Sequence, residues 1–148
     1  MESHSHNNSK SFITANEHHN NRIKSIGRIS TGSGNLDNLL AGGIETEAVI
    51  EFYGESGSGK TQLCHTLCAL VPQDRSEGGI PGKTIYIDTE RKFRADRIIE
   101  ITKARRLDPD DTLKNILLAQ PNNSTQQESI LDGIDIHTNN IHYLQHSC

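Results

Sequence analysis

Apolar residues are concentrated between Ile23 and Leu118, and the chain is polar on both sides of this region. A short apolar run at residues 48–54, AVIEFYG, ends in glycine and predicts a buried strand. KTQLCHTLCALV at residues 60–71 carries leucines at helical spacing and predicts a helix. KTIYIDTE at residues 83–90 places two isoleucines on one face and predicts a second strand. A strand, a helix and a strand in this order are typical of an α/β protein.

Two further elements extend this order. ADRIIEITKARRL at residues 95–107 predicts a helix, and LKNILLAQ at residues 113–120 leads into or forms a third strand. The alternation predicts a parallel sheet with right-handed crossovers and flanking helices. Upstream, GRISTGSGNLDNLLAGGI predicts a short extended piece, a turn and a helix that is capped by Ser33 or Asn35 and ended by the glycine pair 42–43.

The two ends of the chain lack this periodicity. Residues 1–22 are rich in Asn, Ser and His, so we expect a largely disordered or linker segment, interrupted only by SFITA at residues 11–15. Residues 121–148 are also polar, and Gly133 interrupts a weak helical pattern there. The pattern therefore divides the chain into a flexible N-terminal linker (1–22), an α/β core (23–120) and a polar C-terminal tail (121–148).

Composition agrees with this division and excludes several classes of protein. Hydrophobic residues make up 32% of the 148 residues, below the about 45–50% of ordinary globular domains, so part of the chain is expected to stay unpacked. The formal net charge of −4 does not favour nucleic-acid binding by the chain as a whole. Three cysteines without framework spacing, no apolar N-terminal segment and no long apolar run favour an intracellular, cytoplasmic location without a membrane partner.

The strongest chemical motif is GESGSGKT at residues 54–61, between the predicted strand and the predicted helix. It matches the phosphate-binding pattern G-x-x-x-x-G-K-[ST] in the expected context, and a glycine-rich turn without a ligand is the weaker alternative. The glycines allow backbone angles that turn successive N–H groups toward phosphate oxygens, and the helix N-terminus adds partial positive charge. We therefore predict that ATP, with Mg²⁺, is bound by Gly54, Glu55, Ser56, Gly57, Ser58, Gly59, Lys60, Thr61 and Gln62.

Two side chains of this loop have separate predicted roles. Lys60 is expected to reach the β- and γ-phosphates as a point charge and so to act in catalysis, and the Thr61 hydroxyl is expected to bind Mg²⁺. Hydrolysis also needs a group that positions water. Glu90 is the candidate because it follows the second predicted strand, and ligands of parallel sheets bind at the carboxyl ends of strands. The alternative for Glu90 is a solvated loop acid.

Three stretches resemble the RecA-type recombinase family that includes archaeal RadA, over roughly residues 11–127: ISTGSGNLDNLLAGGIETEAVIEFYGESGSGKTQLCHTL, KTIYIDTERKFRADRI and LDPDDTLKNILLAQ. The resemblance implies the P-loop NTPase fold, with residues 23–120 as a partial RecA-type ATPase core. It implies an ATP-dependent recombinase that forms filaments on single-stranded DNA and exchanges strands during DNA repair. It also implies that Glu90 is the catalytic glutamate and that Arg94 packs on the adenine.

The same resemblance assigns a role to the SFITA segment. Family members carry a short F-x-x-A sequence in the linker before the core, and Phe12 and Ala15 match it. In the family the Phe enters a pocket of the neighbouring protomer, and the adjacent backbone adds a strand to that protomer's sheet. Phe12 and Ala15 are therefore predicted to mediate association with a second copy or with a full-length recombinase.

The sequence also departs from the family pattern. The family's helix-hairpin-helix domain and two DNA-binding loops have no match, and the residues after NNI lack the Asp that ends the Walker B strand. A core truncated at this strand is therefore expected. Arg91 and Lys92 stand where the family usually has small or uncharged residues, which places two extra cations near the γ-phosphate side.

These observations leave two functions open. The first is the DNA-dependent ATPase core of a recombination and repair protein. The second is a catalytically inactive nucleotide-binding module that joins or caps a full-length recombinase filament, which the absent Asp and the intact F-x-x-A favour. A small nucleotide kinase is disfavoured, because neither a phosphate-acceptor site nor an Arg-rich lid is visible in the sequence.

Overall fold

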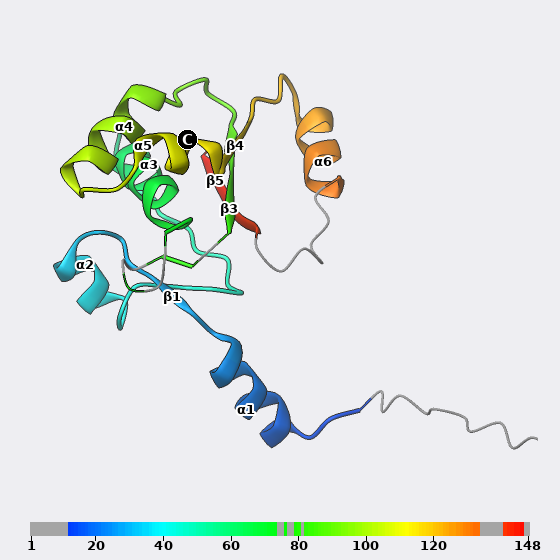
Figure 1. The fold of residues 1–148 in the computed structure, drawn as a ribbon. Helices are drawn as coiled ribbons and strands as arrows, with labels where there is room; N and C mark the ends of the chain where they lie inside the picture. Colours follow the sequence, from blue (N-terminus) through cyan, green and yellow to red (C-terminus); the bar gives the residue numbers. More distant parts are fainter. Residues whose placement is uncertain (1–11, 74–75, 77–78, 81, 134–140, 147–148) are drawn as a thin grey trace, which may run out of the picture.

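A small parallel sheet with helices around it forms the centre of the molecule (Figure 1). The computed structural model describes residues 12–73, 76, 79–80, 82–133 and 141–146. In this part of the chain β3 (Lys83–Asp88) is the middle strand, with β4 (Ile116–Ala119) on one side and β5 (Ile141–His146) on the other. Both neighbours run parallel to β3, which confirms a mixed α/β fold with a parallel sheet.

The register places the centre of β3 between two apolar positions. Tyr86 lies opposite Leu118 of β4 and Leu144 of β5. From its second residue onward β3 is buried, as expected for a middle strand that is covered on both faces. The strand predicted at residues 83–90 is therefore confirmed for 83–88, and its last two predicted residues form the turn that follows.

Helices cover both sides of this sheet (Figure 1). α3 (Lys60–Leu70), α4 (Ala95–Ala104) and the short α5 (Pro109–Lys114) lie on one side, and α6 (Ser124–Asp132) lies on the other. The helices predicted at 60–71 and 95–107 are confirmed as α3 and α4. The N-terminal ends of α3 and α4 lie toward the same end of the sheet as the carboxyl end of β3, which brings the loops that carry the candidate site residues together.

The main core lies between the sheet and its helices. Its members come from α3, β3 and α4: Cys68, Ala69, Tyr86, Ile98 and Ile101. Cys64 and Phe93 pack against this cluster. The isoleucine face of α4 thus packs against α3 and β3. The leucine face of α3 lies in a second cluster, where Leu67 packs with Ile29 and Val71.

Two of the shorter helices were not expected from the sequence. α5 begins after Asp108, whose carboxylate accepts from the backbone N–H groups of Asp110 (2.9 Å) and Asp111 (3.0 Å). Pro109 occupies the first helical position, where its missing N–H has no cost. α6 lies within the segment expected to be an irregular tail, and the Asn123 side chain caps it by accepting from the N–H of Gln126.

The N-terminal part of the described chain contains a small antiparallel pair. β1 (Arg28–Ile29) pairs with β2 (Ile44–Glu45), and α2 (Gly34–Leu39) lies between them in sequence. Ser33 is the N-cap residue of α2, one of the two positions expected to begin this helix. The side chain of Arg105 donates to the Gly32 carbonyl (3.0 Å), which joins this part to the end of α4.

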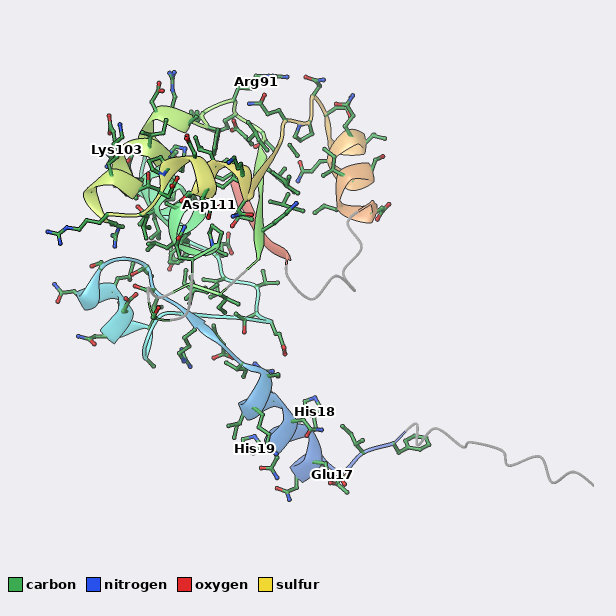
Figure 2. The ribbon with its side chains drawn as sticks, in the orientation of Figure 1. Glu17, His18, His19, Arg91, Lys103 and Asp111 are labelled. Carbon is green, nitrogen blue, oxygen red and sulfur yellow. The ribbon has the colours of Figure 1, made fainter. Side chains whose placement is uncertain are left out.

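The expectation of an irregular segment at residues 1–22 is wrong for residues 15–22. These residues belong to α1 (Ala15–Ser25), an exposed helix that projects away from the sheet (Figure 1). Thr14 and Glu17 form a capping box, in which each side chain accepts from the other residue's backbone N–H. This local pair stabilises the first turn of α1. The side chains of Glu17, His18 and His19 extend from α1 away from the rest of the chain (Figure 2).

The strand predicted at residues 48–54 is also wrong. This segment has no strand pairing in the described part of the chain, and its apolar side chains are exposed, with Tyr53 at 92%. A run of apolar residues becomes a buried strand only where a neighbouring strand accepts its backbone hydrogen bonds. β5 and β4 are the outer strands of the described three-stranded sheet, and neither pairs with residues 48–54.

Candidate functional site

The glycine-rich loop connects residues 48–53 to α3, as the motif predicted. Gly57 (φ 83°) and Gly59 (φ 99°) have left-handed backbone conformations, and Gly59 is the N-cap residue of α3. A side chain at either position would be strained, because a Cβ atom disfavours positive φ. The two glycines therefore let the loop curl in front of the helix N-terminus, where backbone N–H groups and the helix dipole favour an anion.

Lys60 is the first residue of α3 and folds back over this loop. Its Nζ donates to the carbonyl oxygens of Gly54 (2.7 Å) and Glu55 (3.0 Å) and lies 3.5 Å from Ser58 Oγ. These contacts hold the ammonium group at the mouth of the loop. A pocket at this place is lined by Ser56, Gly57, Ser58, Gly59, Lys60, Thr61, Gln62 and Lys92.

The pocket fits a nucleotide phosphate better than a metal ion alone. Within the described residues no three His, Cys, Asp or Glu side chains gather closely enough to hold a metal. Mg²⁺ is commonly bound through one or two protein oxygens together with substrate phosphates and water. Thr61, on the first turn of α3, contributes a hydroxyl to the lining of this pocket, and its binding of Mg²⁺ stays a prediction.

The turn after β3 is anchored by a buried carboxylate, Asp88. Asp88 accepts from the backbone N–H groups of Lys92 (3.0 Å) and Phe93 (2.9 Å) and from the Gln120 side-chain amide (3.1 Å). These bonds close residues 88–93 into a compact turn and join it to the end of β4. Burial raises the pKa of Asp88, but the donors from Phe93, Lys92 and Gln120 outweigh it, so the pKa lies below its ordinary value.

This lowered pKa makes the stability of the turn depend on pH. The carboxylate stabilises the fold fully above its unfolded pKa of about 3.9, and that contribution is lost as the pH falls through the lower pKa of the folded state. We expect Asp88→Asn to lower the free energy of unfolding at pH 7. The difference from wild type should shrink in acid, because Asp88 is then protonated in both states.

Urea unfolding of the two proteins across this pH range checks the prediction. Asp96→Asn is the matched control, since Asp96 is an exposed residue of the first turn of α4. An equal loss of stability from both substitutions, or a difference that grows in acid, would contradict the role of Asp88.

Glu90 lies in the turn that Asp88 anchors, and it contacts Lys92, a residue of the pocket lining. Lys92 Nζ and Glu90 Oε2 form an ion pair, and Lys92 itself lines the pocket. The Glu90 side chain is 21% exposed, and its role as the catalytic base stays a prediction. The structure therefore brings Glu90, Lys92 and the Lys60 loop to one place, although they come from two separate connections.

Arg94 follows this turn as the N-cap residue of α4. Its backbone N–H donates to Nε2 of His65 on α3 (3.3 Å), and the His65 ring stacks on Tyr86 and contacts Phe93 edge-on. This aromatic packing joins the turn after β3 to the helix that carries the glycine loop. The Arg94 side chain is exposed and does not line the pocket, so its predicted contact with adenine stays a prediction.

The predicted association residues lie far from this pocket. Phe12 is 90% exposed, and Ala15 is the first residue of α1. Nothing in the described part of the chain covers the Phe12 ring. Their role in association is therefore still a prediction, and it concerns a surface that is separate from the phosphate pocket.

The sequence predicts no contact within the site for three residues that contribute to it: His65, Asp88 and Lys92. The pattern places His65 in a predicted helix and Asp88 in a predicted strand, and the family resemblance places Lys92 as an extra cation near the γ-phosphate side. The positions of His65 and Lys92 depend on how α3 packs against the turn, for which the sequence has no local signal.

A mixed α/β fold whose glycine-rich loop carries the pattern G-x-x-x-x-G-K-[ST] at the N-terminus of a helix is that of P-loop proteins. Within that class, the Rad51 family model matches residues 22–144. The DNA repair and recombination protein RadA of Cenarchaeum symbiosum is 47% identical over 123 residues, which cover 83% of this chain and 31% of that protein. The chain therefore belongs to the Rad51 family, and it spans about a third of the length of this curated relative.

Among the described residues, no helix is both long enough and apolar enough to cross a membrane.

Proposed function

We propose that this chain binds Mg-ATP and forms the DNA-dependent ATPase core of a strand-exchange protein in DNA repair and homologous recombination. The observation that carries the proposal is the curled glycine loop with Lys60 folded over it at the N-terminus of α3. Support also comes from Rad51 family membership and from a relative named as a DNA repair and recombination protein. In this proposal residues 23–120 form a partial RecA-type core, residues 1–22 a linker and residues 121–148 a divergent segment.

In this proposal some residues bind the nucleotide and others take part in the hydrolysis of ATP. Backbone N–H groups of residues 56–61 bind phosphate oxygens, and Lys60 exchanges its carbonyl contacts for the β- and γ-phosphates. Thr61 would hold Mg²⁺ together with the phosphates of ATP, and the ion would supply positive charge next to the phosphoryl group. Glu90 orients the attacking water and accepts its proton, which needs this carboxylate within hydrogen-bond reach of that water. Arg94 packs on the adenine by family resemblance.

The test is Mg-ATP binding and turnover by the purified chain, with and without single-stranded DNA. Calorimetry measures the affinity, and phosphate release measures turnover. Binding with turnover that rises on addition of DNA is the expected result. No binding of Mg-ATP by a folded chain, established by circular dichroism, would overturn the proposal.

A second candidate is a nucleotide-binding module that does not hydrolyse ATP but joins or caps a filament of full-length recombinase. Two observations favour it. β5 has the sequence IHYLQH and so ends without a carboxylate, and the exposed Phe12 belongs to an F-x-x-A segment. Binding of Mg-ATP without turnover, in the presence and absence of DNA, would select this function over the first.

The association step can be tested separately, because Phe12 lies far from the pocket. We expect Phe12→Ala to abolish most self-association or binding to a full-length Rad51-family recombinase, since burial of one Phe ring contributes about 1.5–3 kcal/mol. Sedimentation velocity of the chain alone and mixed with the recombinase measures this. Ile13→Ala removes the neighbouring exposed apolar side chain and serves as the matched control. Unchanged sedimentation of the Phe12→Ala protein would contradict the role of F-x-x-A.

A further inference from the structure

Two lysines from different elements line the phosphate pocket. Lys60 begins α3, and Lys92 lies in the turn between β3 and α4. The P-loop pattern includes only the first of them. Lys92 therefore adds a cation to the pocket that the motif does not require, and its contacts indicate what that cation does.

The backbone of Lys92 is held firmly, whereas its side chain has room to move. Its N–H donates to Asp88 Oδ1 at 3.0 Å, and the next residue, Phe93, is fixed by Asp88 and by ring contact with Tyr86. The Lys92 side chain is 56% exposed. Its four-carbon stem can thus swing from a fixed base without disturbing the core.

In this structure the Lys92 ammonium is paired with the Glu90 carboxylate at the edge of the pocket. A nucleotide phosphate carries more negative charge than one carboxylate, so a phosphate bound at the glycine loop competes for Lys92. Glu90 is the residue proposed to act on the water that attacks the terminal phosphate. Because Lys92 is in contact with Glu90, it lies on the side of the pocket where that terminal phosphate would be.

We propose that Lys92 is a further phosphate-binding residue that selects the triphosphate, moving from Glu90 to the terminal phosphate when ATP is bound. The move has a second effect, since it leaves the Glu90 carboxylate to accept a hydrogen bond from water. This inference rests on the proposed nucleotide-binding function. It adds a specificity residue that belongs to this chain's own turn after β3.

Comparison with Arg91 shows that a position in the pocket lining, and not positive charge alone, distinguishes Lys92. It adjoins Lys92 and carries the same charge, yet its guanidinium donates to the Asn122 side chain, on the segment that leads to α6. Figure 2 shows Arg91 at the end of β3, beside that segment. Arg91 does not line the pocket. Its substitution therefore changes the net charge of the same turn by the same amount while leaving the pocket intact.

The experiment measures the dissociation constants of Mg-ATP and Mg-ADP by calorimetry for wild type, Lys92→Met, Arg91→Met and Lys92→Arg. We expect Lys92→Met to weaken ATP binding about tenfold and to change ADP binding less than about twofold, as for one charge-assisted contact to the terminal phosphate. Arg91→Met should leave the ratio of the two affinities at its wild-type value. Lys92→Arg should restore most of that ratio, because it retains the charge.

The outcomes separate this inference from the function on which it rests. A wild-type chain that binds neither nucleotide contradicts the proposed function itself. If the wild-type chain binds ATP and the ratio of ATP to ADP affinity is the same for Lys92→Met as for Arg91→Met, only the role of Lys92 is contradicted. Equal thermal midpoints and circular dichroism spectra for the variants would show that a change in affinity is not due to misfolding. We expect this result because the side chains of Arg91 and Lys92 are both exposed.

Discussion

Replacement of Lys60 by alanine is expected to weaken Mg-ATP binding by at least about 100-fold. The Lys60 ammonium lies at the mouth of the glycine loop, where it is positioned to exchange the carbonyl oxygens of Gly54 and Glu55 for phosphate oxygens. A hydrogen bond to a charged group contributes about 1.5–3 kcal/mol, and each 1.4 kcal/mol is about tenfold in affinity. Two such contacts account for the expected loss, which calorimetry with Mg-ATP measures.

Lys103→Ala is the control for this substitution. Lys103 is an exposed lysine in the last turn of α4, and Figure 2 shows it extending from that helix on the side away from α6. The Lys103→Ala protein should bind Mg-ATP with wild-type affinity. This result would exclude a general effect of lower positive charge. If Lys60→Ala retains wild-type affinity while its circular dichroism spectrum is unchanged, the glycine loop is not a nucleotide site.

Replacement of Glu90 by glutamine is expected to lower ATP turnover by about 10²–10⁴-fold, the usual contribution of a general base. Mg-ATP affinity should change only a few-fold, because the amide retains an oxygen that accepts from Lys92 and the turn is anchored by Asp88. Phosphate release at saturating Mg-ATP and DNA measures turnover, and calorimetry measures binding in the same preparations.

The matched control is Glu100→Gln on α4. Glu100 is also a partner in an ion pair, with Arg97, but its side chain is 64% exposed and does not line the pocket. Turnover of this control should equal that of wild type. Turnover of Glu90→Gln within about threefold of wild type would remove Glu90 from the chemistry and leave the ion pair with Lys92 as a structural contact.

The two substitutions separate binding from turnover because their residues lie on different elements. Lys60 belongs to α3, whereas Glu90 belongs to the turn after β3. The two elements are held together by His65, which accepts from the N–H of Arg94 and stacks on Tyr86. The distance between the phosphate loop and the candidate base is therefore set by packing between a helix and a strand, and not by either loop alone.

Several elements could be predicted from the sequence because their signals are local. The leucine spacing of α3, the alternation of β3 and the isoleucine pattern of α4 each extend over only a few residues, and all three elements are confirmed. The Thr14–Glu17 capping box and the Asp108–Pro109 helix start are equally local signals, and each begins a helix in the structure.

The error at residues 48–54 has a cause outside that segment. AVIEFYG has the composition of a buried strand, yet in this chain its side chains are exposed and it pairs with no described strand. A strand requires a neighbour for its backbone hydrogen bonds, and the identity of that neighbour is not contained in the strand itself. Local composition is therefore sufficient to predict an amphipathic helix but not the position of a strand in a sheet.

The glycine loop, the lysine and threonine that follow it, and the acid after β3 can all be predicted from the sequence, because each belongs to a short contiguous motif. The structure was needed to show that Lys92 lines the phosphate pocket and pairs with Glu90. It also shows that Asp88 closes the turn by accepting from Lys92, Phe93 and Gln120. The Gln120 contact and the pocket lining shared with α3 join residues from separate elements, and they form only when packing of α3 and β4 against β3 brings those elements together.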